Sequence, residues 1–181
     1  MFNERQVAVY PLGKEDEWYI SQFDCEDEEM NRFFREECLE EQNFGLNKTF
    51  VLYYCGDLAA FCSICADRIS LASSEKEVSQ LPRNSVPAVK IARLGRDKKY
   101  KDLKLGRYLM EYVQYQVLNI SQEQLGIRFI TLDAYPARVP FYESLNFIQN
   151  VQQDARKGTV SMRFDIFSSS ESLNMVNEDT A

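Results

Sequence analysis

The region between residues 89 and 121 constrains the fold of this chain more strongly than any other. Residues 89–95 (VKIARLG) have the composition of a buried β-strand, and residues 105–121 place apolar side chains at helical spacing along one face. The connection is basic: residues 96–107 hold six Lys or Arg and two Asp or Glu, in a chain of net charge −7. The sequence therefore predicts a strand that runs through a basic segment into an amphipathic helix.

Further strands and helices alternate along the chain. Aromatic and β-branched residues over 48–55 and 58–69, separated by Gly-Asp at 56–57, are typical of a β-hairpin. We also predict strands over 7–12, 127–134 and 159–167, a helix over 23–44, a loop over 70–87 and a short helix over 137–145. This order predicts a single α/β or α+β domain over residues 1–167, followed by a flexible polar tail over residues 168–181.

The helix predicted over residues 23–44 is strongly acidic. Asp24 stands in the N-cap position, and Gly45 supplies the stop. From residue 15 to residue 41 there are twelve acidic and two basic residues. Two interpretations stay open, a solvated helix face and a docking surface for a basic partner.

Length and hydropathy predict a globular protein without a membrane span. The chain has 181 residues, enough for one domain with a full core, and no apolar run approaches the ~18 residues of a spanning helix. The first residues, MFNERQVAVYPL, lack the pattern of a signal peptide. We therefore expect a cytoplasmic protein.

The absence of histidine limits the chemistry that this chain can perform. Mechanisms that use Ser-His, Cys-His or His-bound metal are excluded, so protons must move through other side chains, water or the substrate. The odd number of cysteines, five, argues for free thiols. Cys62 and Cys65 form a CxxC, which could indicate redox chemistry or half a zinc site. Because the pair lies within a predicted strand, we expect packing and no metal.

The basic segment before the second long helix has the local features of a phosphate site. The first amides of a helix have no partner within it, and the helix dipole adds positive potential there. The cations that would reinforce such a site are Lys98, Lys99, Lys101, Lys104 and Arg107. A solvated basic turn without a ligand is the alternative, and the residues by themselves do not decide between the two.

Two blocks of the sequence resemble the core of the GNAT superfamily of acetyl-CoA-dependent N-acetyltransferases. They are ARLGRDKKYKDLKLGRYLM, residues 92–110, and LDAYPARVPFYESLNF, residues 132–147. The resemblance covers about residues 7–167. It implies a mixed, mostly antiparallel sheet of about six to seven strands flanked by about four helices. It also implies acetyl-CoA as cosubstrate and a primary amine as acceptor.

The resemblance assigns coenzyme-binding residues to two segments. The family loop has the pattern Q/R-x-x-G-x-G/A, to which this chain aligns residues 101–106, with lysines at 101 and 104 in place of the first two signature residues. The residues assigned to the pyrophosphate are Lys101, Asp102, Leu103, Lys104, Leu105, Gly106 and Arg107. Those assigned to the pantetheine arm are Leu94, Gly95 and Arg96.

Tyr142 matches the family tyrosine that acts as general acid on the departing coenzyme A thiolate. The alternative for Tyr142 is ordinary packing against Phe141 and Phe147. No general base is evident in the sequence. A water chain to Asp67 or Asp133 is one route for the amine proton, and an α-amine of low pKa needs little help.

Within the superfamily, the chain is most similar to the subgroup that includes toxins acetylating aminoacyl-tRNA. The similar stretches are FDCEDEEMNRFFREECLEEQNFGLNKTFVL and LPRNSVPAVKIARLGRDKKY. The sequence pI of about 4.8 disfavours a nucleic-acid partner, so the charge predicts a cationic amine acceptor. Acetylation of aminoacyl-tRNA and a binding or regulatory module with weakened catalysis stay as alternatives, and a homodimer is compatible with the resemblance.

Overall fold

The computed structural model describes residues 3–168 and divides into two compact units. Unit 1 comprises the residues up to Cys65 together with Ile91–Val113, and unit 2 comprises Ala66–Lys90 and the residues from Gln114 onward. All of the predicted C-terminal tail except Ser168 lies outside the described residues. Over the described residues, no helix has the length and hydropathy to cross a membrane.

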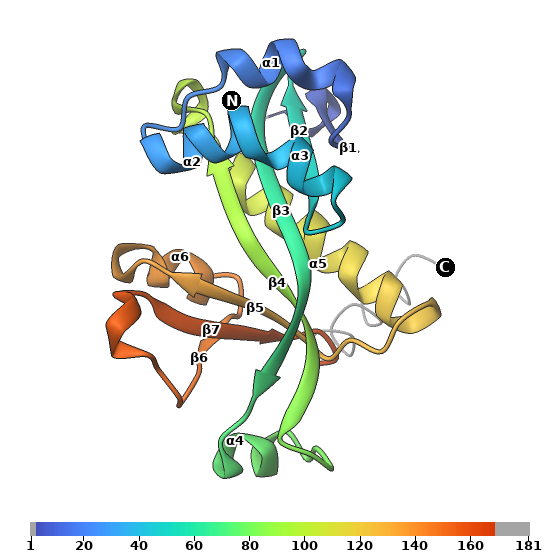
Figure 1. Ribbon diagram of the computed structural model, residues 1–181, viewed down its shortest axis with the longest axis vertical. Helices are drawn as coiled ribbons and strands as arrows, with labels where there is room; N and C mark the ends of the chain where they lie inside the picture. The colour runs from blue at the N-terminus through green and yellow to red at the C-terminus, as the bar shows by residue number, and fades with distance from the viewer. Residues whose placement is uncertain (1–2, 169–181) are drawn as a thin grey trace. The chain divides into compact units, whose positions relative to one another are not determined.

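The strands form one seven-stranded sheet in the order β1-β2-β3-β4-β5-β7-β6 (Figure 1). The strands are β1 (Val7–Pro11), β2 (Lys48–Tyr54), β3 (Asp57–Ser70), β4 (Ser85–Arg96), β5 (Phe129–Ala134), β6 (Ile148–Gln149) and β7 (Val160–Asp165). β4 and β5 pair in parallel, whereas β1 with β2, β2 with β3, β5 with β7 and β6 with β7 pair antiparallel. The predicted mixed, mostly antiparallel sheet is confirmed.

Unit 1 packs short helices on the first strands. The helical elements are α1 (Glu17–Gln22), α2 (Glu28–Arg32), a π-helical turn (Phe33–Glu37) and α3 (Cys38–Asn43). Their apolar side chains meet strand residues in one core cluster, in which the rings of Phe34 and Phe61 stack with centroids 3.9 Å apart. Burial of these aromatic rings stabilises the unit, because each ring removes a large apolar surface from water.

The hairpin between β2 and β3 is confirmed, but its turn lies one residue earlier than predicted. Cys55 and Gly56 have φ values of 54° and 88°, and Tyr54 pairs with Asp57. Positive φ at both central residues is the geometry of a type I′ turn, which suits the twist of a hairpin. Asp57 therefore begins the second strand instead of completing the turn.

The acidic helix begins later than predicted and is interrupted. Asp27, not Asp24, is the N-cap, and its carboxylate accepts a hydrogen bond from the Met30 N–H at 3.0 Å. Asp24 lies outside the helix and has other partners. The predicted stop is confirmed, because Gly45 has a φ of 73°.

Unit 2 contains a helix where the sequence predicted only a loop. α4 (Ser73–Val78) begins after Ala72, whose N–H donates to the Glu75 carboxylate at 2.8 Å. The short helix predicted over 137–145 is confirmed as a 3-10 turn, Pro136–Arg138, followed by α6 (Val139–Glu143). Proline in the first turn of α6 is tolerated because the N–H that it lacks has no partner there.

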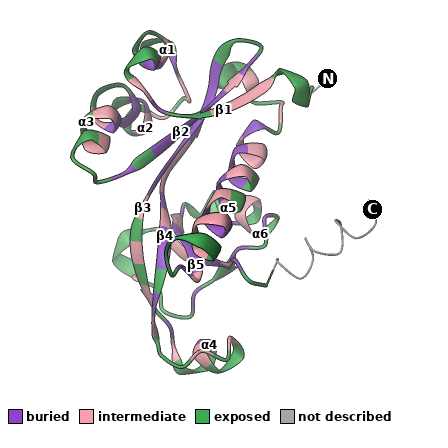
Figure 2. Ribbon diagram, turned by 90° about the vertical axis from the view of Figure 1, so that its right-hand side faces the viewer, coloured by how far each residue is buried: buried purple, intermediate pink, exposed green. Residues whose placement is uncertain are grey.

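The long amphipathic helix is confirmed as α5 (Leu105–Glu123), which contributes residues to both units. Its predicted apolar face is buried at Leu105, Leu109, Val113 and Val117, each with no exposed surface. Figure 2 shows the buried and exposed residues of α5 on different sides of the helix. The apolar face predicted from the helical spacing is therefore the face that α5 buries.

Candidate functional site

The basic segment of unit 1 is anchored at Asp97. This residue is 2% exposed, and its N–H donates to the Ala59 carbonyl at 2.8 Å. Its two carboxylate oxygens accept from the Asp24 N–H at 3.0 Å and from the Lys99 N–H at 2.9 Å. A 3-10 turn, Lys98–Tyr100, follows. The segment therefore leaves β4 from a fixed point before it reaches α5.

The cations of this segment divide into two groups. The Lys98 ammonium lies 2.6 Å from an Asp24 carboxylate oxygen and the Arg107 guanidinium 3.4 Å from a Glu111 carboxylate oxygen, so these two are not the uncommitted cations that the sequence suggested. Lys99, Lys101 and Lys104 are exposed and form no ion pair with any residue between 3 and 168. These three ammonium groups are therefore the ones left for an external anion.

The first turn of α5 offers backbone donors beside these cations. The Tyr108 N–H donates to the Lys104 carbonyl at 3.1 Å and closes the first turn of the helix. The Leu105 and Gly106 amides come before this first intrahelical donor, so neither has an acceptor within the helix. Amides and ammonium groups together make a geometry suited to a phosphate.

Lys104 occupies its position without backbone strain. Among the described non-glycine residues, positive φ occurs only at Glu26, Cys55, Gln80 and Asn146. A glycine is therefore not required at position 104 for conformational reasons, although the family pattern has one there.

The end of β4 holds the residues that the resemblance assigned to the pantetheine arm. Gly95 is buried, and a Cβ atom at this position would lie 2.5 Å from Cε1 of Phe61. Packing inside unit 1 therefore requires glycine here. Leu94 and Arg96 are half-buried, and the Arg96 guanidinium donates to the Asp97 carbonyl at 3.3 Å.

Tyr142 lies in α6 of unit 2 and is half-buried. Its ring makes edge contacts with Phe141, at a centroid distance of 5.0 Å, and with Phe147, at 5.8 Å. Its carbonyl accepts from the Leu145 and Phe147 N–H groups. The packing described by the alternative interpretation is thus present, and it also fixes the ring from which the hydroxyl projects.

The two carboxylates considered as bases have partners within unit 2. Asp67 accepts a hydrogen bond from the Thr131 hydroxyl at 2.5 Å. Asp133 lies 2.7 Å from the Lys90 ammonium and 3.6 Å from that of Lys157. Partial burial raises the pKa of Asp133, but the bond and charge of Lys90 outweigh it, so the pKa lies below its ordinary value. Asp133 is therefore a weak base.

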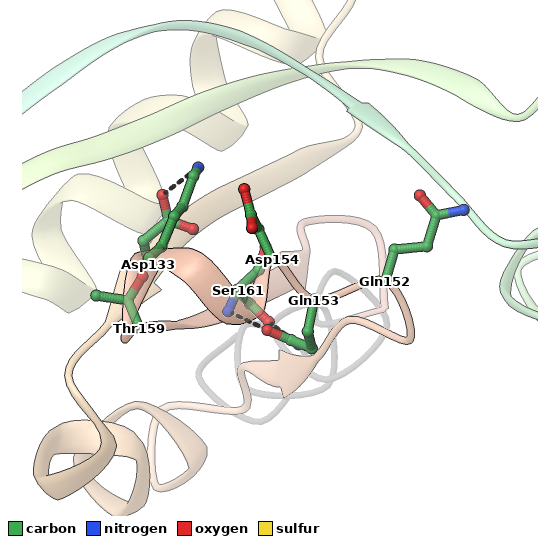
Figure 3. Close-up of a pocket in the computed structure, with 7 residues that line it drawn as sticks. Asp133, Gln152, Gln153, Asp154, Thr159 and Ser161 are labelled. Carbon is green, nitrogen blue, oxygen red and sulfur yellow. Dashed lines mark hydrogen bonds and ion pairs between the residues drawn. The ribbon is translucent and has the colours of Figure 1, made fainter.

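Unit 2 also contains a polar cavity that the sequence did not reveal. It has a volume of about 310 Å³ and is lined by Asp133, residues 152–154, Lys157, Thr159 and Ser161 (Figure 3). Asp133 comes from β5, Ser161 from β7, and the others from the connection between β6 and β7. The signal available in the sequence was the polar run QNVQQD, which carries no periodicity.

The cysteines form no disulfide and remain free thiols, as predicted. Cys62 is fully buried in β3, and burial raises its pKa to about 12. Cys65 lies three residues further along the same strand, so the two side chains point to opposite faces of the sheet. This geometry supports packing as the role of Cys62 and does not suit a shared ligand.

Comparisons with known proteins identify the fold. No protein-family model and no curated protein matches the sequence. A Tyr-to-Phe variant of KacT superposes with a TM-score of 0.80 at 20% identity, covering 92% of this chain and 98% of that one. AtaT complexed with acetyl-methionyl-tRNAfMet gives 0.79 at 18% identity, with coverage of 94% and 98%. AtaTR bound with AcCoA gives 0.74 at 18%, with coverage of 93% and 99%. The GNAT fold predicted from the sequence is confirmed.

Proposed function

We propose that this protein is an acetyl-CoA-dependent N-acetyltransferase that acts on the α-amino group of aminoacyl-tRNA. The observation that carries the proposal is the segment before α5, where unpaired ammonium groups and helix amides together suit a pyrophosphate. The fold likeness to AtaT, one structure of which is complexed with acetyl-methionyl-tRNAfMet, supports the acceptor. The proposal includes a cytoplasmic location, where charged tRNA and acetyl-CoA are both present.

In the proposed reaction the neutral amine attacks the thioester carbonyl of acetyl-CoA. The new C–N bond forms, the C–S bond breaks, and the departing thiolate takes a proton from the Tyr142 hydroxyl. The proton that leaves the amine passes through water and restores the tyrosine. Lys101, Lys104 and the first amides of α5 hold the pyrophosphate, and the main chain of residues 94–96 pairs with the pantetheine arm.

The shortage of bases favours an acceptor of low pKa. The chain has no histidine, and the pKa of Asp133 is held below its ordinary value. An α-amino group has a pKa of ~8, so roughly a tenth of it is neutral at pH 7, whereas a lysine-type amine of pKa ~10.4 is almost fully protonated. An α-amine therefore reaches its reactive form without a strong base in the site.

The acidic segment opposes tRNA less than its charge suggests. Asp16 accepts from the Gly13 N–H and the Tyr53 hydroxyl, and Asp24 is paired with Lys98. Asp27 caps α2. Neutral donors leave the charges of Asp16 and Asp27 in place, but Glu29 and Glu37, like Asp24, have cationic partners, Arg93 and Arg32, which weakens the argument for a cationic acceptor from the count of acidic residues.

A cationic primary amine is the second candidate acceptor. The hollow along α2, about 560 Å³, carries Glu28, Glu29 and Glu36 beside Arg32 and Arg35, so it is mixed in charge. The two candidates are separated by measuring acetyl transfer to charged tRNA and to a panel of polyamines and lysine-rich peptides, at matched ionic strength. Efficient acetylation of the amines with none of the tRNA would reject the proposed acceptor.

The enzymatic role itself is tested by Tyr142→Phe. This change removes one hydroxyl and keeps the ring contacts with Phe141 and Phe147, so folding and acetyl-CoA binding should persist. Turnover should fall about 10²–10⁴-fold, the range for a positioned proton donor. Unchanged turnover would leave Tyr142 as a packing residue, and acetyl-CoA binding without any transfer would favour a binding module.

A further inference from the structure

The cavity at the end of β5 differs from an ordinary ligand pocket in its lining. Ligand pockets are mostly apolar with a few polar groups, but all seven residues that line this one are polar or charged. They provide two carboxylates, two amides, two hydroxyls and one ammonium. The volume of about 310 Å³ corresponds to roughly ten water molecules at ~30 Å³ each. The cavity can therefore hold a small hydrogen-bonding group.

The walls of the cavity are fixed by the chain itself. The Gln153 amide donates to the Asn150 carbonyl at 2.7 Å and to the Ser161 carbonyl at 3.0 Å, and it accepts from the Ser161 N–H at 2.8 Å. The side-chain amide of Asn150 donates to the Ser161 hydroxyl at 2.8 Å. Figure 3 shows the contact between Gln153, in the connection, and Ser161, in β7.

A buried ion pair contacts the residues next to these walls. Arg163 and Glu75 are 2.5 Å apart, and each side chain is 6% exposed. The same Glu75 oxygen accepts from the Val151 N–H at 2.9 Å, and Arg163 donates to the Asn150 side chain at 2.7 Å. A buried pair often stabilises no more than apolar residues would. Here it fixes the two residues that precede the cavity lining, which is how binding sites are preorganised.

The charges of the lining are already balanced. Asp133 faces Lys90 and Lys157, and Asp154 holds Arg156 through both of its carboxylate oxygens at 2.9 and 3.0 Å. A cationic ligand would meet these cations, and an anionic ligand would meet the two carboxylates. An uncharged polar group is the class that the balance favours.

Two lining side chains keep their hydrogen-bonding capacity for a ligand. Gln152 and Thr159 have no hydrogen-bond partner in the part of the chain that the structure describes. Ser161 accepts from Asn150 and still carries its own hydroxyl proton. An apolar group in this cavity would displace water from these groups without replacing its hydrogen bonds.

We propose that this cavity receives the side chain of the amino acid that is acetylated, and that it selects uncharged amide or hydroxyl side chains over apolar and charged ones. The inference rests on the proposed function, because it assumes an aminoacyl acceptor. Its position supports it: Asp133 is the last residue but one of β5, and the chain continues through Pro136–Arg138 into α6, which carries Tyr142.

The test compares tRNAs charged with amino acids of similar shape. For threonine against valine, and for glutamine against methionine, kcat/KM should favour the polar member about 2- to 10-fold, the effect of one ordinary hydrogen bond to a half-exposed side chain. Lysyl and glutamyl groups should also be poor acceptors. In Gln152→Leu/Thr159→Val the ratios should fall to about one, whereas the exposed Gln122→Leu should keep them.

The possible outcomes distinguish a failure of this inference from a failure of the proposed function. Equal use of polar and apolar aminoacyl groups, or unchanged ratios in the double variant, overturns the inference and leaves the proposed function intact. If no aminoacyl-tRNA is acetylated, the proposed function fails. The inference is then tested with the amides of threonine, valine, glutamine and methionine. Their binding is measured by the shift in melting temperature of the protein. Equal shifts overturn the inference, and shifts for the polar amides only uphold it.

Discussion

The basic segment of unit 1 and the cavity segment of unit 2 are both rich in charge, but they use it differently. In the basic segment, Lys99, Lys101 and Lys104 are exposed and have no ion-pair partner in the described structure. Around the cavity, each cation named above has a carboxylate partner. Lys90 and Lys157, for example, both lie beside Asp133. Charge left unpaired is available to an external polyanion, whereas paired charge shapes the walls of a site.

The cost of removing a charge should therefore differ between the two regions. A buried partner that loses its counter-ion remains as an uncompensated charge in a medium of low dielectric constant. An exposed lysine that is removed leaves only solvated groups behind. We expect changes in unit 2 to appear as lost stability and changes in the basic segment to appear as lost affinity.

The largest effect is expected from Glu75→Gln, which leaves Arg163 buried without its counter-ion. The free energy of unfolding should fall by about 3–5 kcal/mol, measured by urea denaturation. The control is Glu77→Gln on the same helix, where the side chain is exposed and the change should stay within about 0.5 kcal/mol. If the two variants lost similar amounts of unfolding free energy, the paired charge would contribute no more to stability than the unpaired one.

The next effect is expected from Lys101→Ala/Lys104→Ala. Removing two exposed cations should weaken acetyl-CoA binding about tenfold, since each contributes less than ~1 kcal/mol. Stability in the absence of ligand should not change. The loss of affinity should be larger at low salt, where screening is weaker.

Isothermal titration of the variant at two salt concentrations measures this effect. A matched control is Lys14→Ala/Lys48→Ala, which removes two exposed lysines elsewhere in unit 1. An equal loss in the control would show that overall charge, rather than the basic segment, attracts the coenzyme.

A smaller effect is expected from pH on the stability of unit 2. Burial raises the pKa of Glu75, but hydrogen bonds from the Val151 and Ala72 N–H groups and the charge of Arg163 outweigh it, so the pKa lies below its ordinary value. The pKa of Asp133 is also lowered. The unfolded chain therefore binds more protons in acid, and the stabilisation is present above the unfolded-state pKa of ~4 and lost as pH falls.

Urea denaturation between pH 7 and pH 3 measures this loss. For one carboxylate the slope cannot exceed about 1.4 kcal/mol per pH unit. Glu75→Gln should show a shallower slope below pH ~4 than Glu77→Gln, because the lowered pKa is absent from the first variant. Equal slopes would mean that Glu75 does not carry the dependence.

Local patterns in the sequence predicted the parts of the fold that depend on nearby residues. The amphipathic spacing of α5 was found as predicted, and so was the hairpin of β2 and β3 apart from a shift of its turn by one residue, because each is encoded within a short stretch. The start of the acidic helix was wrong because Asp24 and Asp27 are equally good caps in sequence. Contacts between Asp24 and Asp97, 73 residues apart, decide between them.

The candidate sites divide in the same way. The basic segment is continuous in sequence, so its charge and its place before a helix could be predicted. The cavity is assembled by strand pairing: β5 and β7 bring Asp133 opposite Ser161, and Glu75 holds Val151 from 76 residues away. No fixed spacing in the sequence connects these residues, and none of them belongs to a recognisable sequence motif. Such a site becomes visible only in three dimensions.

The smallest effect is expected from Lys98→Ala, which removes a paired cation of the basic segment and so resembles the paired charges of unit 2. The Lys98 ammonium is 2.6 Å from Asp24, and its N–H donates to the Asp24 carbonyl at 2.8 Å. Because this ammonium already has a partner, its removal should change acetyl-CoA affinity by less than about twofold. Asp24→Asn should release the ammonium, so affinity should stay equal or rise. If Lys98→Ala instead weakened binding as much as Lys101→Ala, the pair would have to open for the coenzyme. The division of the segment into committed and uncommitted cations would then fail.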